Sequence, residues 1–329
     1  MDDSFINILV FYTFCGAAFF QLFYFLFFYL RLANYKPKEK KITQYPPVSV
    51  IICARNEDTN LKQHLPKILA QDYPAFEVIV VDDNSDDGTT EYLFFLSQKE
   101  PRLKRTKTGN SNRMMAGKKF PLTLGLKAAA NELVVLTDAD CYPATNQWLK
   151  QVVSGYATDD KAIVLGYGAY EKKPGRLNRR IRYETFLTAL NYLSFALAKL
   201  PYMGVGRNLS YQKGLFFSTN GFFDHRHIPS GDDDLFINKV ATKKNTEIVI
   251  SPDAFTYSPP KETREEWIEQ KTRHMSTARY YRAKHKFWLA LQPISHILFW
   301  VTSLYLLATV FVYWYIVAAA FVLRWALLR

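Results

Sequence analysis

Two long apolar segments at the ends of the chain constrain its fold most strongly. The first, Phe5–Leu30, is interrupted mainly by Asn7, Thr13 and Gln21. This run exceeds the roughly 20 apolar residues that a helix needs to cross a bilayer. Acidic residues precede it, and it lacks the basic start and small-residue cleavage site of a signal peptide. We therefore predict an uncleaved transmembrane anchor over residues 1–31.

The second apolar segment, Phe287–Leu328, is too long for a single membrane-spanning helix. His296 is its only readily charged residue before Arg324. Two helices joined by a tight turn near Thr309–Trp314 would fit, although neither Gly nor Pro marks that turn. We predict a C-terminal transmembrane region of one or two helices over residues 287–329.

The positive charge of the chain lies beside these apolar segments. The net charge is +12, and basic residues flank the ends of the middle region at Arg31, Lys36, Lys38, Lys40, Lys41, Arg279, Arg282, Lys284 and Lys286. This placement favours anionic lipid head groups as the partner over nucleic acid. Because the basic residues follow the first anchor, the positive-inside rule places the rest of the chain in the cytoplasm. We expect an integral protein of the cytoplasmic (inner) membrane that binds no nucleic acid.

The middle of the chain has the mixed composition of a folded domain. A basic, proline-containing linker over residues 32–47 leads into a predicted cytoplasmic domain over residues 48–286. Buried β-branched strands alternate there with helices: strands over Val48–Ala54, Phe76–Val81 and Leu133–Leu136, and helices over Asn60–Ala70, Thr89–Gln98 and Pro121–Ala130. This alternation indicates an α/β fold with a mostly parallel, doubly wound sheet. The three cysteines show neither a disulfide framework nor a zinc spacing, which indicates a reducing compartment.

Polar clusters follow all three predicted strands, at the edge where doubly wound sheets bind ligands. They are Arg55-Asn56-Glu57, Asp82-Asp83-Asn84 and Asp138-Ala139-Asp140. The paired carboxylates of the last cluster are hard oxygen ligands that suit Mg²⁺ or Mn²⁺ beside a phosphate, or else they are two solvated acids of a loop. The Asp82 cluster could read a nucleobase or simply cap the helix that follows it.

Taken together, the motifs resemble those of the family-2 inverting glycosyltransferases. The order and spacing match in five segments: Ser49–Glu57, Val80–Thr89, Gly117-Lys118, Thr137–Asp140 and Ser230–Leu235, followed by Gln270-Lys271-Thr272-Arg273-His274, which is similar to the family's Gln-x-x-Arg-Trp segment. Gly204–Tyr211 resembles the family segment that borders the acceptor and the donor sugar. The resemblance spans about residues 48–275.

The resemblance implies a GT-A nucleotide-sugar-binding fold and a role for each matched residue. Ala54, Arg55 and Glu57 would line the nucleoside, Asp82 or Asp83 would read the base, Lys118 and the Gln270 segment would lie near the donor phosphates, and Asp140, supported by Asp138, would hold Mg²⁺ or Mn²⁺. Asp233 would be the general base, with the neighbouring Asp232 as the alternative, and Arg273 would steady the leaving diphosphate.

The expected activity is inverting transfer of a sugar from a nucleotide diphosphate, with UDP favoured by the resemblance, to a lipid-linked or other membrane-proximal acceptor such as a glycan. A processive polysaccharide synthase is the first alternative. It is disfavoured by the few predicted membrane helices and by His274, which replaces the tryptophan of such synthases. The second alternative is a catalytically silent scaffold that keeps the fold.

One further helix is expected between the motifs. Arg179–Leu200 has apolar residues near one face: Phe186, Leu187, Leu190, Leu193, Leu197 and Leu200. The periodicity is typical of a helix that packs on the core, or of one that lies in the membrane interface beside a lipid acceptor.

Overall fold

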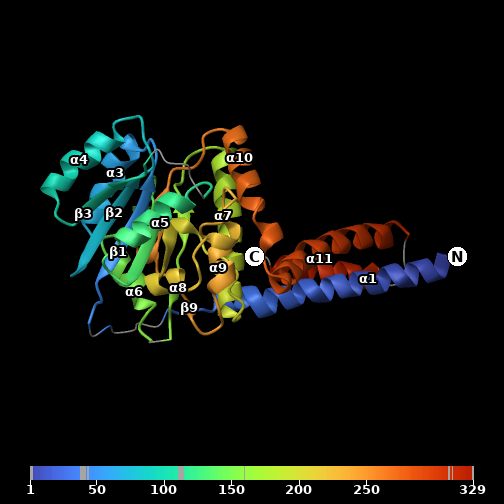
Figure 1. Ribbon diagram of the computed structural model, residues 1–329. Coiled ribbons are helices and arrows are strands. Elements are labelled where there is room, and N and C mark those ends of the chain that lie inside the picture. Colours follow the sequence, from blue (N-terminus) through green and yellow to red (C-terminus); the bar gives the residue numbers. More distant parts are fainter. Residues whose placement is uncertain are drawn as a thin grey trace. The chain divides into compact units, whose positions relative to one another are not determined.

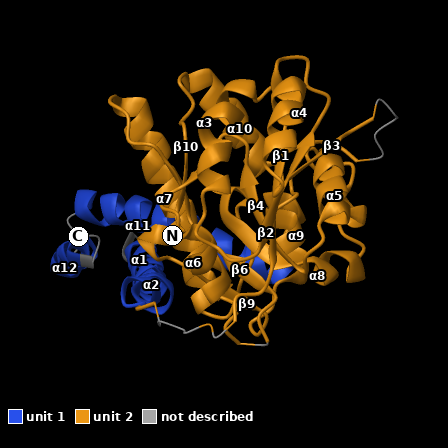
Figure 2. Ribbon diagram, turned by 90° about the vertical axis from the view of Figure 1, so that its left-hand side faces the viewer, with its two compact units in different colours: residues 1–35, 282–329 blue, residues 36–281 orange. Residues whose placement is uncertain are grey.

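The computed structural model describes residues 3–37, 42, 44–109, 115–158, 160–309, 312 and 314–327. These residues form two compact units, one of residues 36–281 and one of residues 1–35 with 282–329 (Figure 2). Within the predicted linker, residues 38–41 and 43 lie outside the described residues, and so does most of its basic cluster.

The larger unit is built on a seven-stranded sheet with the order β3-β2-β1-β4-β8-β6-β9 (Figure 1). Its parallel part comprises β1 (Val48–Ala54), β2 (Phe76–Asp82), β3 (Leu103–Lys107) and β4 (Leu133–Asp138). The remaining strands are β6 (Ile163–Leu165), β8 (Leu209–Gln212) and β9 (Thr246–Ile248), of which β8 runs antiparallel to both β4 and β6. The predicted α/β class with a mostly parallel sheet is confirmed.

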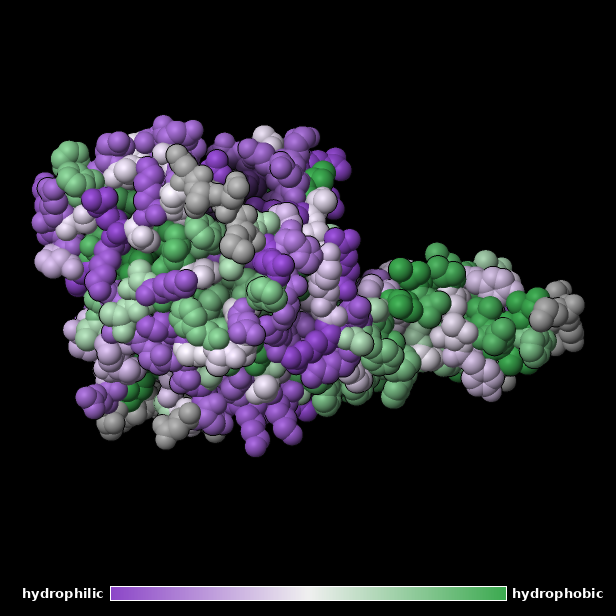
Figure 3. Space-filling view, viewed as in Figure 1, coloured by the Kyte–Doolittle hydropathy of each residue, from purple (hydrophilic) through white to green (hydrophobic). Residues whose placement is uncertain are grey.

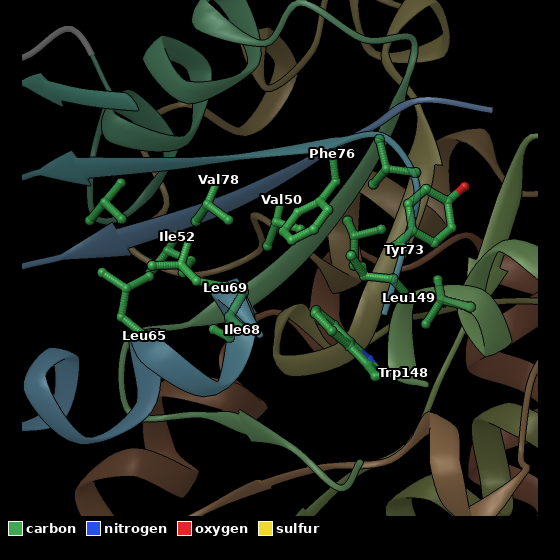
Figure 4. Packing of buried hydrophobic residues seen from close by; sticks show 14 of the residues in the cluster. Val50, Ile52, Leu65, Ile68, Leu69, Tyr73, Phe76, Val78, Trp148 and Leu149 are labelled. Atoms are coloured by element: carbon green, nitrogen blue, oxygen red, sulfur yellow. The ribbon is translucent and has the colours of Figure 1, made fainter. Parts of the chain in front are cut away.

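Successive residues of the parallel strands point to opposite faces of the sheet, and helices cover both faces. Val50 and Ile52 of β1 pack in a core with side chains of α3 (Asp58–Leu69) and α6 (Trp148–Ser154) (Figure 4). Leu93 of α4 (Thr89–Lys99) belongs to the same core. On the other face, α5 (Lys119–Ala128) approaches β1 so closely that a Cβ on Gly125 would lie 2.6 Å from Cγ2 of Ile51. This burial on both faces explains why the strands are continuous apolar runs.

Apart from the helix expected over Arg179–Leu200, the sequence did not predict the elements of the second half of the larger unit. A three-stranded sheet has the order β5-β10-β7, formed by β5 (Tyr142–Pro143), β10 (Thr256–Ser258) and β7 (Gly168–Tyr170). The helices of this half are α7 (Arg176–Leu197), α8 (Lys213–Ser218), α9 (Asp234–Val240) and α10 (Arg264–Met275), with 3-10 turns at Gly206–Asn208, Phe223–His225, Pro252–Ala254 and Ala278–Tyr280. Strands of two to four residues are too short to show a recognisable alternation of apolar and polar residues.

The face that α7 buries differs from the expected leucine face. Its buried residues include Ile181, Ala189 and Tyr192. Of the expected face Leu193 is buried as well, whereas Phe186 is exposed. Tyr192 is tied to the sheet because its hydroxyl donates to the carbonyl oxygen of Gly166 at 2.6 Å. The helix therefore packs on the core through a mixed set of apolar and polar residues, which leaves part of its apolar surface outside the core.

The smaller unit consists of apolar helices. A continuous helical segment comprises α1 (Asp3–Tyr24), a π-turn (Phe25–Tyr29) and α2 (Leu30–Ala33), and it packs along α11 (Ala283–Ala308). α12 (Trp314–Leu327) follows the predicted turn, of which residues 310, 311 and 313 lie outside the described residues. Within the described residues, Phe5–Ala33 and Ala283–Ala308 are long and apolar enough to cross a membrane. Figure 3 shows the apolar side chains that cover these helices.

A polar cluster joins the three helices of this unit. The Nε of Arg324 donates to Oε1 of Gln21 at 2.8 Å, and its terminal nitrogen lies 3.3 Å from the ring of His296. Gln21 in turn donates to the carbonyl oxygen of Ser295 at 3.1 Å. The two ionisable residues that interrupt the C-terminal apolar segment therefore partner each other, and Arg324 also contacts Gln21 near the C-terminal end of α1.

Candidate functional site

The loops after β1 and β2 are bonded together into one rigid platform. The backbone N–H of Asn56 donates to Oγ of Ser85, and its Oδ1 accepts from the N–H of Asp86, both at 3.0 Å. The N–H of Glu57 donates to Oγ1 of Thr89 at 3.0 Å. The Asn-Ser-x-Asp-x-Thr pattern therefore has a structural purpose, since its side chains bond the two loops that the motifs predicted to lie at one edge of the sheet.

Asp82 and Asp83, the two acids at the end of β2, have different hydrogen-bond partners. Asp82 accepts from the N–H of Ser85 at 2.9 Å and from the hydroxyl of Thr90 at 2.5 Å, so its carboxylate closes the turn. Asp83 donates its N–H to the carbonyl oxygen of Ala54 at 2.7 Å and accepts from Thr108 at 2.9 Å. Asp82 is thus committed to the loop, and Asp83 is the better candidate to meet a ligand at this edge.

Asp138 and Asp140 form the only group of possible metal ligands found among the described residues, together with Cys141. The ligand atoms of these three residues lie within 4.8 Å of one another. Burial and the charge of Asp138 raise the pKa of Asp140. Burial raises the pKa of the Cys141 thiol well above its usual range. Two crowded carboxylates are a donor set that fits a hard divalent cation, which would relieve their repulsion.

Two cations flank the acid pair. Lys118 forms an ion pair with Asp138, and although burial alone would raise the pKa of that carboxyl, the attraction of Lys118 lowers it below its usual value. Arg207 lies over the ring of Tyr170 at 4.3 Å and interacts electrostatically with both Asp138 and Asp140. The arrangement is suited to binding an anion with several oxygens next to a cation, as phosphate groups are bound.

The three-acid run begins α9, and its members have different surroundings. Both oxygens of Asp233 accept backbone N–H groups, Oδ2 from Gly206 and Oδ1 from Asp234, each at 2.7 Å. Burial and the charge of Asp234 raise the pKa of Asp233 to about 6. Asp234 instead accepts from the hydroxyls of Thr277 and Tyr281 at 2.5 and 2.7 Å. Asp234 is therefore structural, and Asp233 is a fixed carboxylate with the proton affinity of a base that works near neutral pH.

Asp232 lies on the side of Lys118. Its carboxylate interacts electrostatically with Lys118 and Asp138, and burial followed by the charge of Asp233 raises its pKa to about 6. The two adjacent carboxylates thus face different surroundings, since Asp233 is held by the loop that contains Gly206.

Close backbone approach brings Lys118 to the loop before the acids. Gly117 has a φ of +64°, and a Cβ there would lie 2.0 Å from the carbonyl oxygen of Pro229. The next residue, Lys119, is fully buried and donates to the carbonyl oxygens of Ile228 at 2.6 Å and Ser230 at 2.5 Å. Gly117 therefore provides both the backbone conformation and the space for the contact with the loop before the acids. The hydrogen bonds of Lys119 hold that contact in place.

Replacing Lys119 by Met is expected to destabilise the protein by about 2–3 kcal/mol, because the carbonyl oxygens of Ile228 and Ser230 lose a charged donor. For a unit of this size we expect the Tm to fall by about 5–10 °C. Thermal unfolding followed by circular dichroism measures the effect. Lys127→Met, on the exposed side of the same helix, is the matched control. An equal Tm for the two variants contradicts the assigned role.

α10 brings two of its three motif residues to the site. Gln270 accepts from the hydroxyl of Tyr170 at 3.3 Å, and His274 interacts electrostatically with Asp138. Arg273 lines a cavity of about 650 Å³ together with Pro229 and other residues of the acid loop. Among the described residues, no ion pair joins Arg273 to the acids of the site.

The structure thus gathers most of the residues that the sequence singled out. Ala54, Glu57, Lys118, Asp138 and Asp140 lie together, with Asp83, Asp232, Asp233 and Gln270 around them. Arg55 is exposed on the loop after β1. Two contributors were not assigned a role. Arg207 lies in the Gly204–Tyr211 segment that the resemblance had marked, but Tyr170 had no signal in the sequence because its place is set by the pairing of β7 with β10.

These features define a nucleotide-binding type of α/β fold with an acidic site at the carboxyl ends of its parallel strands. Residues 49–223 match the family described as Glycosyl transferase family 2. The chain belongs to this family.

Sequence relatives and solved structures agree with this membership. The chain is 27% identical over 257 residues to YdaM of Bacillus subtilis, described as a probable glycosyltransferase, which covers 74% of this chain and 58% of the relative. It is 29% identical over 143 residues to a beta-monoglucosyldiacylglycerol synthase of Synechocystis, covering 43% of this chain and 28% of that protein. The chain therefore spans less than two thirds of the length of these relatives.

The fold is similar to that of the mannosyltransferase PcManGT of Pyrobaculum calidifontis, solved in complex with GDP-Man and Mn²⁺. The TM-score is 0.63 with 23% sequence identity, and the match covers 92% of this chain and 86% of that one. This similarity confirms the GT-A type of fold.

Proposed function

We propose that the protein transfers a sugar from a nucleotide diphosphate to a hydroxyl group of an acceptor, with inversion at the anomeric carbon. The observation that carries the proposal is the pairing of two different acidic sites in one unit. Asp138 and Asp140 form a cation-suited pair flanked by Lys118 and Arg207, while Asp233 is a carboxylate fixed by two backbone amides with a pKa raised to about 6.

Each site has a separate task in the proposed reaction. Asp138 and Asp140 would hold Mg²⁺ or Mn²⁺, which when bound supplies positive charge opposite the diphosphate. Lys118 and Arg207 orient the phosphates, and Arg273 contacts the leaving diphosphate from its cavity. Asp233 takes the proton of the acceptor hydroxyl while the new C–O bond forms and the bond to the diphosphate breaks. A single displacement of this kind inverts the anomeric centre and needs no nucleophile from the enzyme.

The base of the donor nucleotide is proposed to meet Asp83 and the loop after β1. Asp83 lies at this edge of the sheet, where it accepts from the hydroxyl of Thr108, and a carboxylate can accept the N–H of a nucleobase. We propose UDP as the nucleotide on the basis of the family resemblance. Titration of UDP and GDP in the presence of Mn²⁺ by calorimetry tests this choice, and tighter binding of GDP would overturn it.

We propose that the acceptor is lipid-linked or is another membrane-proximal molecule such as a glycan. The apolar unit leaves large side chains such as Phe5, Leu9 and Phe19 exposed along α1, as a helix in hydrocarbon would. The basic residues that follow α1 favour a cytoplasmic position for the catalytic unit. One of the relatives is named as a synthase of a glycosylated diacylglycerol. We therefore propose that the chain is an integral protein of the inner membrane.

A panel of nucleotide sugars tests the proposed donor chemistry. The full chain in detergent is incubated with each donor, Mn²⁺ or Mg²⁺ and extracted membrane lipids, and released nucleoside diphosphate is measured. Release that depends on the metal and is confined to one donor supports a transferase. The scaffold alternative predicts no release from any donor and no metal-dependent nucleotide binding.

A further inference from the structure

A second cavity lies beside the site, on the side of Tyr170. It measures about 390 Å³ and lies between α7 and the small sheet. Aromatic and cationic side chains line it, among them Tyr167, Tyr170, Arg179, Arg182, Tyr183 and Phe186. None of the motifs discussed above includes the residues of α7 that line this cavity.

The cavity contains two arginines, Arg179 and Arg182. Arg179 is exposed and Arg182 is half-buried, and within the described part of the chain neither forms an ion pair. Glu184, two residues after Arg182, pairs instead with Lys271 at 3.1 Å, and Glu262 lies 4.0 Å from Lys173. Two unpaired guanidinium groups in one concave site are suited to an anion with several oxygens, because each can donate two parallel hydrogen bonds.

The aromatic side chains indicate that the ligand is more than a simple anion. Tyr183 and Phe186 are 63% and 52% exposed, although both are large side chains on a helix that packs on the core. Exposed rings of this kind give a surface on which an apolar chain or a sugar ring can pack. The cavity therefore offers charge and apolar contact to the same ligand.

Tyr170 connects this cavity to the acidic site. Its ring lies under the guanidinium of Arg207, and its hydroxyl donates to Gln270. Arg207 interacts with both Asp138 and Asp140. A ligand in the cavity would thus lie one side chain away from the groups that flank the proposed donor phosphates.

We propose that this cavity is an acceptor subsite that binds a phosphate group attached to an apolar or ring-bearing portion of the acceptor, through Arg179 and Arg182. Its assignment to the acceptor rests on the proposed function, whereas the binding of phosphate does not. The phosphate could belong to a lipid or to a soluble phosphorylated compound, which share the same recognition chemistry.

Binding of octyl phosphate to the full chain in dodecyl maltoside tests the proposal by calorimetry. The parent is compared with Arg179→Gln/Arg182→Gln and with the matched control Lys172→Gln/Arg176→Gln, which removes two exposed charges of the same basic run outside the cavity. We expect the first variant to bind at least about tenfold more weakly and the control to change by less than about twofold. Binding of UDP with Mn²⁺ should be equal in all three proteins, which verifies the fold and the donor site.

Other outcomes of this titration would overturn the proposal or identify the source of the phosphate. Equal weakening in both variants would show diffuse surface attraction and overturn the proposal, as would an unchanged affinity in both or no binding by the parent. Titrations with inorganic phosphate, which lacks the alkyl chain, and with octyl glucoside, which lacks the phosphate, show which part of octyl phosphate is bound. Tighter binding of octyl phosphate than of inorganic phosphate assigns a lipid phosphate, and equal binding assigns a soluble one. If phosphate binds as expected but no nucleotide binds, the proposed transferase function fails and the phosphate site stands.

Discussion

Asp233→Asn is expected to lower kcat by a factor of about 10³–10⁴ and to leave nucleotide binding intact. The amide cannot accept the proton of the acceptor hydroxyl, and general base catalysis of this kind contributes about 10²–10⁴-fold. The fold should survive, because the amide oxygen can still accept one of the two backbone N–H groups that hold this side chain. Initial rates under saturating donor, together with calorimetry of UDP and Mn²⁺, measure both quantities.

Asp232→Asn is the matched control for this variant. The two residues are adjacent, both acidic and both half-buried, but only Asp233 is held by the N–H of Gly206. We expect Asp232→Asn to retain substantially more activity than Asp233→Asn. The reverse order would assign the proton transfer to Asp232.

The same carboxylate sets the expected pH dependence. Burial and the charge of Asp234 raise the pKa of Asp233 to about 6, and the base must be ionised to accept a proton. Below pH 6 the carboxyl is protonated, so kcat/KM should fall about tenfold per pH unit, and above pH 6 it should level off. A pH–rate profile that stays flat down to pH 4.5 contradicts this assignment.

Asp140→Asn is expected to weaken metal-dependent binding of the nucleotide by about 100-fold or more. A neutral amide is a poorer ligand for a hard cation than a carboxylate. Loss of the Asp140 carboxylate leaves Asp138, which is already paired with Lys118. Calorimetric titration of UDP with and without Mn²⁺ separates the metal contribution from that of the nucleotide alone. The metal-free affinity should change little or rise slightly, because one negative charge is lost beside the phosphates.

Asp160→Asn is the control for loss of a carboxylate, since Asp160 is exposed and contacts only its sequence neighbours Thr158 and Lys161 among the described residues. It should bind the nucleotide and the metal like the parent. If Asp140→Asn also behaves like the parent, the acid pair does not hold the metal.

The parallel half of the fold could be predicted because its signals are local. Strands buried on both faces are continuous apolar runs, and each ends at a polar cluster that the sheet brings together. The structure extends β2 to Asp82 and β4 to Asp138, so the first acid of each cluster belongs to its strand. The role of Asp82 in closing the turn could also be inferred from the sequence, since Ser85 and Thr90 follow it closely.

The other half, whose strands pair in both parallel and antiparallel directions, could not be predicted in the same way. Its strands span two to four residues, and its order depends on pairings between distant segments, such as β7 with β10. Tyr170 reaches the site only through that pairing. Likewise, α7 buries Asn178 and Thr185 together with Leu193, a mixed stripe that the apolar periodicity did not predict.

Transfer of labelled sugar is the most direct test of the central claim. The full chain is incubated with the labelled donor selected from the panel, Mn²⁺ and membrane lipids, and product is measured in the lipid phase together with free nucleoside diphosphate. We predict equimolar appearance of both, abolished by removal of the metal and in Asp233→Asn, with an inverted anomeric configuration in the product. Metal-independent transfer, or a product that retains the configuration of the donor, would contradict the proposed mechanism.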